Sequence, residues 1–283
     1  MDKTNYRKAK AKELFDKVVI GVQNIINSGE YEKYLRFQKN FIKYSFNNNV
    51  LIYNQFPDAT RVAGKKAWRD LGRETIDNAT RIMITAGMPK KGQKKVKKII
   101  DGKEVEEIQE YEYMSYRSVH VYDISQTTGE PIPMECKAIG GDDMAYFYEK
   151  LKQFSKFPIF EADLQEGLHG FYRPIQKEIV VKNSLSINDK VSVLLHELAH
   201  GLYDDFDYKT DRNLSEVFVE SIAFIVADYF GLDTSLCSLK YITKYANGDS
   251  KVLIDLGTKI QKCAKEFIKD IESFEMQEME VAA

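Results

Sequence analysis

The sequence predicts an α+β protein with two domains, a basic α+β domain followed by a mainly helical domain with a small β-sheet. Segments with apolar residues at helical spacing are mixed with short alternating segments of β character. A length of 283 residues leaves room for two ordinary domains. The charge is also divided: residues 1–100 hold 22 Lys and Arg against 9 Asp and Glu, whereas residues 101–283 hold 19 against 34. We place the domains at 1–131 and 143–275, with a linker at 132–142 and a flexible tail at 276–283.

The first of these domains begins with helices and continues with strands. Apolar residues recur at helical spacing over 3–28 and again over 31–44, so both segments predict amphipathic helices. The asparagine run at 47–49 favours a turn or a helix cap. The remaining pattern predicts a short strand, a glycine turn and a short helix over 59–73, strands at 81–86 and 118–123, and a hairpin at 96–106 around the turn dipeptide Asp101-Gly102.

The second domain follows a segment rich in proline and glycine, which predicts the linker. Its predicted elements are a helix at 142–154, a short strand at 157–160, a hairpin at 170–182, a helix capped by Ser186 or Asn188, a helix at 215–230 ended by Gly231, and a helix at 250–275. A hairpin of this kind, placed before the capped helix, could hold an extended peptide by β-augmentation.

The capped helix contains the pattern His196-Glu197-x-x-His200. Residues four apart lie on one helix face, so the two imidazoles can bind the same metal ion. The pattern is the signature of zinc peptidases, in which the glutamate acts as general base on a metal-bound water. We therefore predict that His196 and His200 bind Zn²⁺ and that Glu197 is catalytic. The alternative is a chance pairing on a solvated helix.

Two glutamates on the next apolar helix complete this prediction. Glu216 and Glu220 stand four residues apart, and carboxylates on a mostly apolar helix need a partner. A catalytic zinc site takes a third protein ligand, and its histidines usually donate their other N–H to a carboxylate. One glutamate can fill each of these roles. The alternative is that Glu216 lies at the exposed helix start and interacts with the helix dipole.

The basic first domain predicts binding of nucleic acid. Basic residues interleaved with aromatic ones are typical of surfaces that hold a single strand, where cations contact phosphates and aromatic rings stack on bases. A solvated basic surface that complements the acidic domain is the alternative. The favoured contacts are Lys65, Lys66, Trp68, Arg69 and Arg73, with a second basic arm that includes Lys94 and Lys95. Core packing is the competing interpretation for Trp68.

The first domain also resembles a known family. The segment from Asn49 to Gly64, followed by Trp68 and the tripeptide Leu71-Gly-Arg73, and later the segment from Val121 to Pro131, resemble the N-terminal domain of ArdC-type antirestriction proteins. That resemblance covers roughly residues 1–131. It implies binding of single-stranded DNA and a mobile genetic element as the source.

The second domain resembles ImmA/IrrE-like metallopeptidases and the peptidase half of ArdC proteins. The zinc helix there is followed by a pattern that stands here as Glu216, Glu220 and Ala223. By this match the domain is a zincin-like metallopeptidase, Glu216 is the metal ligand and Glu220 orients a ligand. Two functions follow: a DNA-binding antirestriction protein with a zinc peptidase domain attached, or a peptidase that cuts a regulatory or DNA-bound protein and is targeted by its first domain. A weaker third possibility is an inactive scaffold that binds zinc.

The cysteines and the apolar segments indicate a compartment. Cys136, Cys237 and Cys263 are widely spaced, which favours reduced thiols in a cytoplasmic protein. The N-terminal residues 1–12 are polar, so we expect no secretory signal, and no apolar run is long enough to predict a membrane span.

Overall fold

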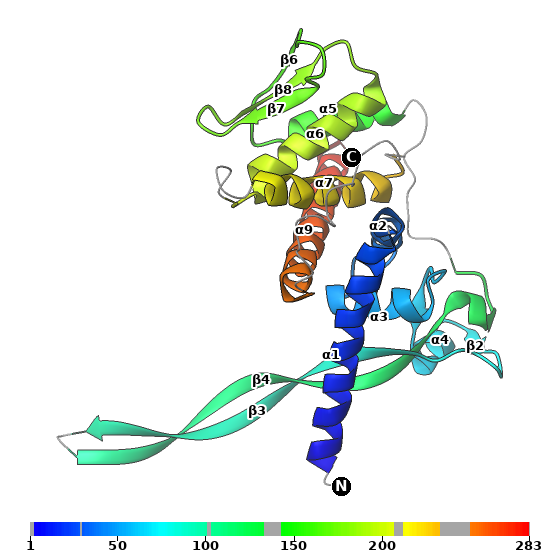
Figure 1. The fold of residues 1–283 in the computed structure, drawn as a ribbon, viewed down its shortest axis with the longest axis vertical. Helices are drawn as coiled ribbons and strands as arrows, with labels where there is room; N and C mark the ends of the chain where they lie inside the picture. The colour runs from blue at the N-terminus through cyan, green and yellow to red at the C-terminus, as the bar shows by residue number, and fades with distance from the viewer. Residues whose placement is uncertain are drawn as a thin grey trace.

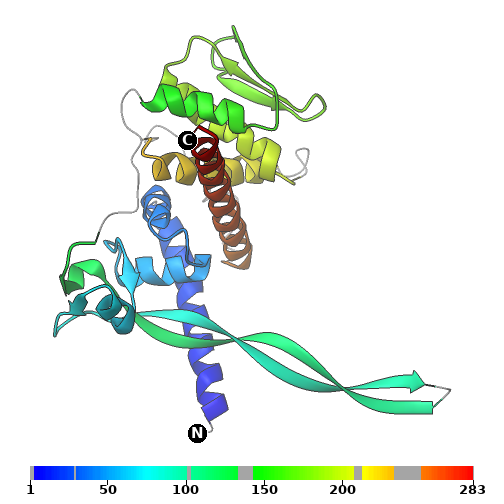
Figure 2. The ribbon, with the colours of Figure 1, turned by 180° about the vertical axis from the view of Figure 1, so that it is seen from behind.

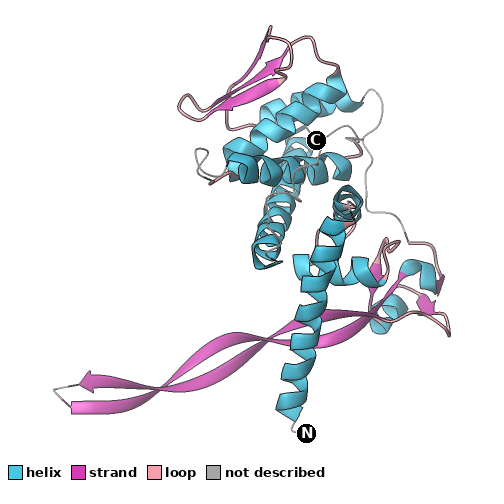
Figure 3. Ribbon diagram, viewed as in Figure 1, coloured by secondary structure: helices cyan, strands magenta, loops and turns pink. Residues whose placement is uncertain are grey.

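The computed structural model describes residues 3–28, 30–100, 103–132, 143–206, 212–232 and 250–282, and mixes helices with small sheets (Figure 1; Figure 3). The predicted α+β class is confirmed. In chain order the elements are α1 Lys3–Asn27, α2 Tyr31–Lys39, α3 Phe46–Gln55, β1 Val62–Ala63, α4 Lys65–Asp70, β2 Arg73–Thr75, β3 Ile82–Ile100, β4 Lys103–Asp123, the 3-10 turn Ile124–Gln126, β5 Thr127–Gly129, α5 Asp143–Phe154, β6 Ile159–Ala162, β7 Gly170–Arg173, β8 Glu178–Lys182, α6 Ile187–Tyr203, α7 Arg212–Tyr229 and α9 Ser250–Ala282.

Some of the predictions fall outside these ranges. The linker at 132–142 lies outside the described residues apart from Ile132, and so do the Asp101-Gly102 turn and the cysteines Cys136 and Cys237. Cys263 is a buried free thiol. The division into two domains stays a prediction. None of the helices in the described ranges has the length and apolar content to cross a membrane.

The helix predicted over 31–44 is shorter in the structure, where α2 ends at Lys39. The chain then turns, and the carbonyls of Ile42 and Tyr44 accept hydrogen bonds from the Nε2 of Gln261, at 3.1 and 3.3 Å. Continuing the helix would have kept these two carbonyls inside it. The early end of α2 therefore gives the buried amide of Gln261 its partners.

The asparagine run, predicted as a turn or cap, lies inside helix α3. The cap is Ser45, whose side chain accepts from the backbone N–H of Asn48. The amide of Asn48 exchanges two hydrogen bonds of 2.9 Å with the backbone of Thr85 on β3, and Gln55 does the same with Met83. These two side chains pair with the outer edge of β3 as a neighbouring strand would.

Strands β3 and β4 form one long antiparallel ribbon, whereas the sequence predicted two short strands and a separate hairpin. Pairing runs without a break from Ile82 opposite Val121 to Ile100 opposite Lys103. The root of the ribbon is buried at Ile82, Ile84 and Val121. Beyond that root the ribbon projects away from the helices, twisting as it goes (Figure 1; Figure 2). We call the part beyond residues 86 and 117 the arm.

The C-terminal elements stack a small sheet on helices. The sheet has the order β6-β8-β7, with β6 parallel and β7 antiparallel to β8. Ser186 caps α6, as the sequence predicted, because its side chain accepts from the N–H of Asp189. Helix α6 packs against β7 and β8 on one side and α7 on another. The chain turns after α7 at Gly231, which has a φ of 84° that suits glycine.

Helices α2, α7 and α9 join the N-terminal and C-terminal elements in one continuous core. Helix α9 contacts α1, α3, α5 and α7 and runs to Ala282, so residues 276–282, predicted as a flexible tail, are helical. Helix α2 packs on α7, where the buried carboxylate of Asp228 receives Arg36 at 3.3 Å and Lys39 at 3.0 Å. The N-terminal helices and the zinc-motif helix are therefore linked through α7.

Replacement of Gln261 by leucine tests the contribution of α9 to this core. The Gln261 side chain is 4% exposed, bonds to Gln38, and accepts from Asn49 Nδ2 at 3.0 Å. Leucine would leave these amides and the Ile42 carbonyl unpaired, so we expect a loss of about 1–3 kcal/mol in the free energy of unfolding. Urea denaturation measures it, with the exposed Lys265→Gln on the same helix as control. A change no larger than in the control would contradict this role.

Candidate metal centre and nucleic-acid surface

Helix α6 presents the two motif histidines toward α7. Its other side is buried through Leu194, Leu195 and Leu198, each 0% exposed, which fixes the rotation of the helix. With that face in the core, His196 and His200 are half-buried one turn apart, and their ring centroids are 4.9 Å apart. The apolar face of the helix thus determines where the imidazoles point.

Glu216 on α7 completes a cluster with both imidazoles. Its Oε2 lies 3.6 Å from His196 Nε2 and 3.7 Å from His200 Nε2. Ligand atoms around a tetrahedral zinc stand about 3.3 Å apart, given bonds of about 2.0–2.1 Å. Among the described residues this is a group that could hold a metal ion, with its three ligand atoms all within 4.8 Å of one another. The structure therefore brings together the three residues that the sequence predicted as ligands.

The groups around His200 shift its pKa, and the pKa values of the neighbouring carboxylates shift as well. The facing imidazoles of His196 and His200 hold the pKa of Glu216 well below its usual range. Burial alone would lower the pKa of His200, but the hydrogen bond with Asp204 and the nearby carboxylates of Glu216 and Glu197 raise it to about 9. Several carboxylates thus converge on one imidazole. A divalent cation bound between the imidazoles would satisfy the same carboxylates.

Asp204 orients His200, a role that the sequence analysis missed. Its Oδ2 lies 2.8 Å from His200 Nδ1 and accepts from Ser215 Oγ at 2.6 Å, while its Oδ1 accepts from the backbone N–H of Phe206 at 3.1 Å. These hydrogen bonds outweigh burial and lower the pKa of Asp204. The signal was present in the sequence, because Asp204 follows His200 by four residues at the end of the helix.

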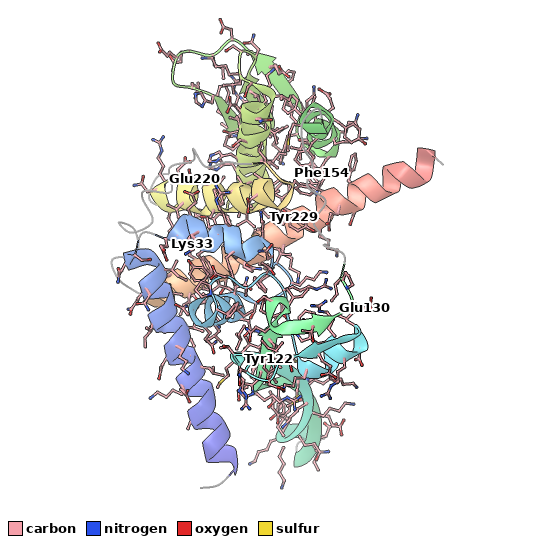
Figure 4. The ribbon with its side chains drawn as sticks, turned by 90° about the vertical axis from the view of Figure 1, so that its right-hand side faces the viewer. Lys33, Tyr122, Glu130, Phe154, Glu220 and Tyr229 are labelled. Carbon is pink, nitrogen blue, oxygen red and sulfur yellow. The ribbon has the colours of Figure 1, made fainter. Side chains whose placement is uncertain are left out.

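The predicted role of Glu220 in orienting a ligand stays a prediction, and at His200 it is Asp204 that occupies the orienting position. Burial raises the pKa of Glu220 to about 6, and the charge of nearby His196 opposes the shift. Figure 4 shows Glu220 on α7 next to α2, which carries Lys33. One residue further along α7, Ser221 lies 3.1 Å from the hydroxyl of Tyr31 on α2. Glu220 therefore lies between the imidazole cluster and the N-terminal helices.

Glu197 is buried beside the outer edge of β7. Its side chain is largely enclosed, and the backbone N–H of Tyr172 donates to its carboxylate. Burial raises the pKa of Glu197, although both histidines oppose that shift. Gly170 permits the close approach of β7 to α6, because a Cβ there would meet Val193 Cγ1 at 2.5 Å. Glu197 is thus held in place by β7 beside the cluster, with a raised pKa.

Three of the predicted nucleic-acid contacts lie on the surface of α4. Lys65, Lys66 and Arg69 are exposed, Lys65 lies 5.3 Å from the ring centre of Tyr122, and Arg69 pairs with Glu74 at 2.9 Å. Figure 4 shows Tyr122 at the root of the ribbon. These three cations remain accessible to a phosphate backbone.

Trp68 is corrected from a DNA contact to a core residue, whereas Arg73 has a structural role and its DNA contact stays a prediction. Trp68 is 0% exposed and its indole N–H donates to the Tyr122 carbonyl at 2.9 Å, so it offers no face to a base. The guanidinium of Arg73 donates to the Thr127 side chain and carbonyl, at 2.8 and 3.0 Å, and to the carbonyls of Gly129 and Glu130. It therefore fixes β2 against β5.

Lys94 and Lys95 lie on the arm and are exposed, but the arm is less basic than its lysine run suggested. The lysine-rich strand β3 is paired with a strand rich in glutamate: Lys91 faces Glu112, while Glu110 and Glu107 face Gln93 and Val96, which lie next to lysines. Opposite charges across the ribbon reduce its net positive field. Only parts of the arm can therefore present cations to a ligand without a carboxylate beside them.

No family model matches the chain. An uncharacterized Bacillus anthracis protein, pXO2-81, is 26% identical over 310 aligned residues that cover 94% of this chain. The chain spans about half of that relative, 52% of its length.

Two solved structures share the fold. The Mn(II)-bound antirestriction protein ArdC of plasmid R388 matches with a TM-score of 0.57 and 14% identity, covering 90% of this chain and 97% of that one. Its metal-free structure matches with a TM-score of 0.52 and 16% identity, covering 81% and 86%. The resemblance that the sequence motifs predicted is thus confirmed at the level of the fold, which this chain shares with ArdC.

Proposed function

We propose that this chain is an antirestriction protein of a mobile genetic element that acts in the cytoplasm, binds single-stranded DNA, and carries a zinc-dependent metallopeptidase centre. The observation that carries the proposal is the cluster of His196, His200 and Glu216 within an ArdC fold. The zincin-like organisation of the second domain and the assignment of zinc belong to this proposal.

The donor set fits a divalent cation. Two imidazole nitrogens and one carboxylate oxygen, with an open fourth direction, are the ligands of catalytic zinc sites. The neighbouring ArdC structure was solved with Mn(II). We favour zinc here, because a site with nitrogen ligands binds Zn²⁺ more tightly than Mn²⁺. When bound, the metal would supply Lewis acidity to a carbonyl and to a coordinated water.

The surrounding residues have separable roles. The carboxylate of Asp204 holds the Nδ1 proton of His200 and so directs its Nε2 toward the cluster. Glu197 would take a proton from the attacking water and deliver it to the leaving amine, while the Tyr172 N–H keeps its carboxylate in place. Glu216 contributes negative charge that favours a cation between the two imidazoles.

DNA binding would use the exposed cations of the N-terminal half. Lys65, Lys66 and Arg69 lie together on the short helix α4 and are exposed. Cations on one surface hold a phosphate backbone without reading its sequence, which suits protection of DNA of any sequence. Trp68 and Arg73 support this surface from within.

The alternative is a metalloendopeptidase that cleaves a regulatory or DNA-bound protein, with the N-terminal half serving for targeting. The burial and the hydrogen bond of Glu197 favour this alternative. A buried glutamate held by a backbone N–H, with a raised pKa, is more than a structural metal site requires. The two functions share the same metal centre and differ in whether DNA protection needs hydrolysis.

Metal analysis of the purified chain tests the centre. We expect one zinc ion per chain in the wild type and none after His200→Ala, which removes a ligand. Asp204→Asn should weaken zinc binding by about 10–100-fold, because the imidazole loses its orienting carboxylate. The exposed His120→Ala serves as control. Zinc retained by His200→Ala would refute the assignment.

Replacement of Glu197 by glutamine separates the two functions. The variant should bind zinc as the wild type does but lose peptide hydrolysis by about 10²–10⁴-fold, because glutamine cannot accept the proton. Hydrolysis is measured on a fluorogenic peptide library, and DNA protection by plasmid survival in a restricting host. We expect protection to persist. Its loss together with hydrolysis would favour the endopeptidase.

The salt dependence of DNA binding tests the α4 surface. We expect the wild-type chain to bind a single-stranded oligonucleotide with an affinity that falls steeply with salt, because phosphate contacts release counterions. Lys65→Gln with Lys66→Gln should weaken binding to all sequences and reduce the slope of log affinity against log salt by about 1.4. Lys262→Gln with Lys265→Gln on exposed positions of α9 is the control. No detectable binding by the wild type would contradict the proposal.

A further inference from the structure

The arm exposes large apolar and aromatic side chains to solvent. Tyr116 is 61% exposed, Ile108 62%, Met114 51%, and Tyr111 and Tyr113 are 43% and 45% exposed. A two-stranded ribbon without a covering layer is only marginally stable in water. Exposed aromatic side chains on such a ribbon are typical of a binding surface.

The pairing register divides the arm into two faces of different charge. We call one of them the stacking face. Its pairs are Lys90–Tyr113, Gly92–Tyr111 and Lys94–Gln109. Toward the root it continues through the pairs Met88–Ser115 and Ala86–Arg117. Side chains of paired residues lie on the same side of a ribbon. Over these five pairs the stacking face therefore carries three cations and no carboxylate, and the next pair toward the tip, Val96–Glu107, adds one carboxylate.

The opposite face carries as many acids as bases over the same length. Its pairs are Gly87–Tyr116, Pro89–Met114, Lys91–Glu112, Gln93–Glu110 and Lys95–Ile108. The side chain of Gln93 donates to Glu110 at 3.3 Å, which engages one of the two carboxylates within the ribbon. Over these pairs the stacking face thus has the greater net positive charge.

The tyrosines of the stacking face form a platform. The rings of Tyr111 and Tyr113 are 5.8 Å apart at an angle of 34°. Tyr111 lies over Gly92, where a Cβ would meet its Cζ at 2.7 Å. The glycine thus lets the ring lie close against the backbone, which leaves the outer ring surface open. Lys90 and Lys94 flank this platform at either end.

We propose that the stacking face binds single-stranded DNA, with unpaired bases on Tyr111 and Tyr113 and phosphates on Lys90, Lys94 and Arg117. Aromatic faces beside cations match a single strand, whose bases are open to stacking, better than a duplex. A second copy of this chain is disfavoured on the same face, because three cations would meet three cations. The inference rests on the proposed DNA binding and makes the arm a contact in addition to α4.

Paired variants of the full chain test the two components of this site. Tyr111→Ala with Tyr113→Ala should weaken binding to a fluorescent oligo-dT by about tenfold or more per tyrosine, because each stack is lost. The matched Tyr→Phe pair should bind as the wild type does. Lys90→Gln with Lys94→Gln should reduce the salt slope by about 1.4, whereas Lys91→Gln with Lys95→Gln, the same charge change on the opposite face, should not.

Three results would overturn the inference: wild-type affinity in the Tyr→Ala pair, equal losses in the two lysine pairs, or equal wild-type affinity for a duplex. Sedimentation provides a further check, since a Tyr→Ala pair that dissociates an oligomer while keeping DNA affinity would assign the face to a second copy. If the wild type binds DNA and only the α4 variants lose it, the arm inference fails alone. If the wild type binds no DNA, the proposed function fails with it.

Discussion

The position of helix α7 depends on burial of nearly all of its length, and the rest of the structure depends on that position. Toward α6 the helix presents Glu216 to the two imidazoles. Toward α2 it presents Asp228 to Arg36 and Lys39. A buried carboxylate between two cations tolerates little displacement, because any separation leaves a charge without a partner. The ion pairs with α2 therefore help to fix Glu216, the third side chain of the candidate metal cluster, which lies three turns away on the same helix.

Local sequence patterns predicted the residues of the candidate metal cluster, but they did not predict Asp204, which orients His200. His196, Glu197 and His200 are positioned by helix spacing alone, and Glu216 by the need of a carboxylate on an apolar helix for a partner. Asp204 lies beyond the regular part of α6, so its contact with His200 depends on how the chain leaves the helix. Trp68 could be assigned either to the core or to a base from its sequence context, and only its 0% exposure decided between them.

The arm was predicted in fragments because it has no buried face beyond its root. Strands are recognised by alternation of apolar and polar residues, and a ribbon solvated on both sides does not show it. The same ribbon explains the charge asymmetry of the sequence. The boundary at residue 100 falls at the tip of the ribbon, so it assigned the lysine-rich β3 to the basic half and the glutamate-rich β4 to the acidic half. Part of that asymmetry is cancelled once the strands pair.

The side-chain amides of Asn48 and Gln55 also determine the mechanics of the arm. By occupying the outer edge of β3 at Met83 and Thr85, they stop another chain from extending the sheet at its root. They also fix the root of the ribbon to helix α3 at two points, so the ribbon is held at its root while the arm projects from it. A load applied near the tip is transmitted to α3, and from there to α9, which packs against it. Force from a ligand bound to the arm would therefore reach helices α3 and α9 of the core.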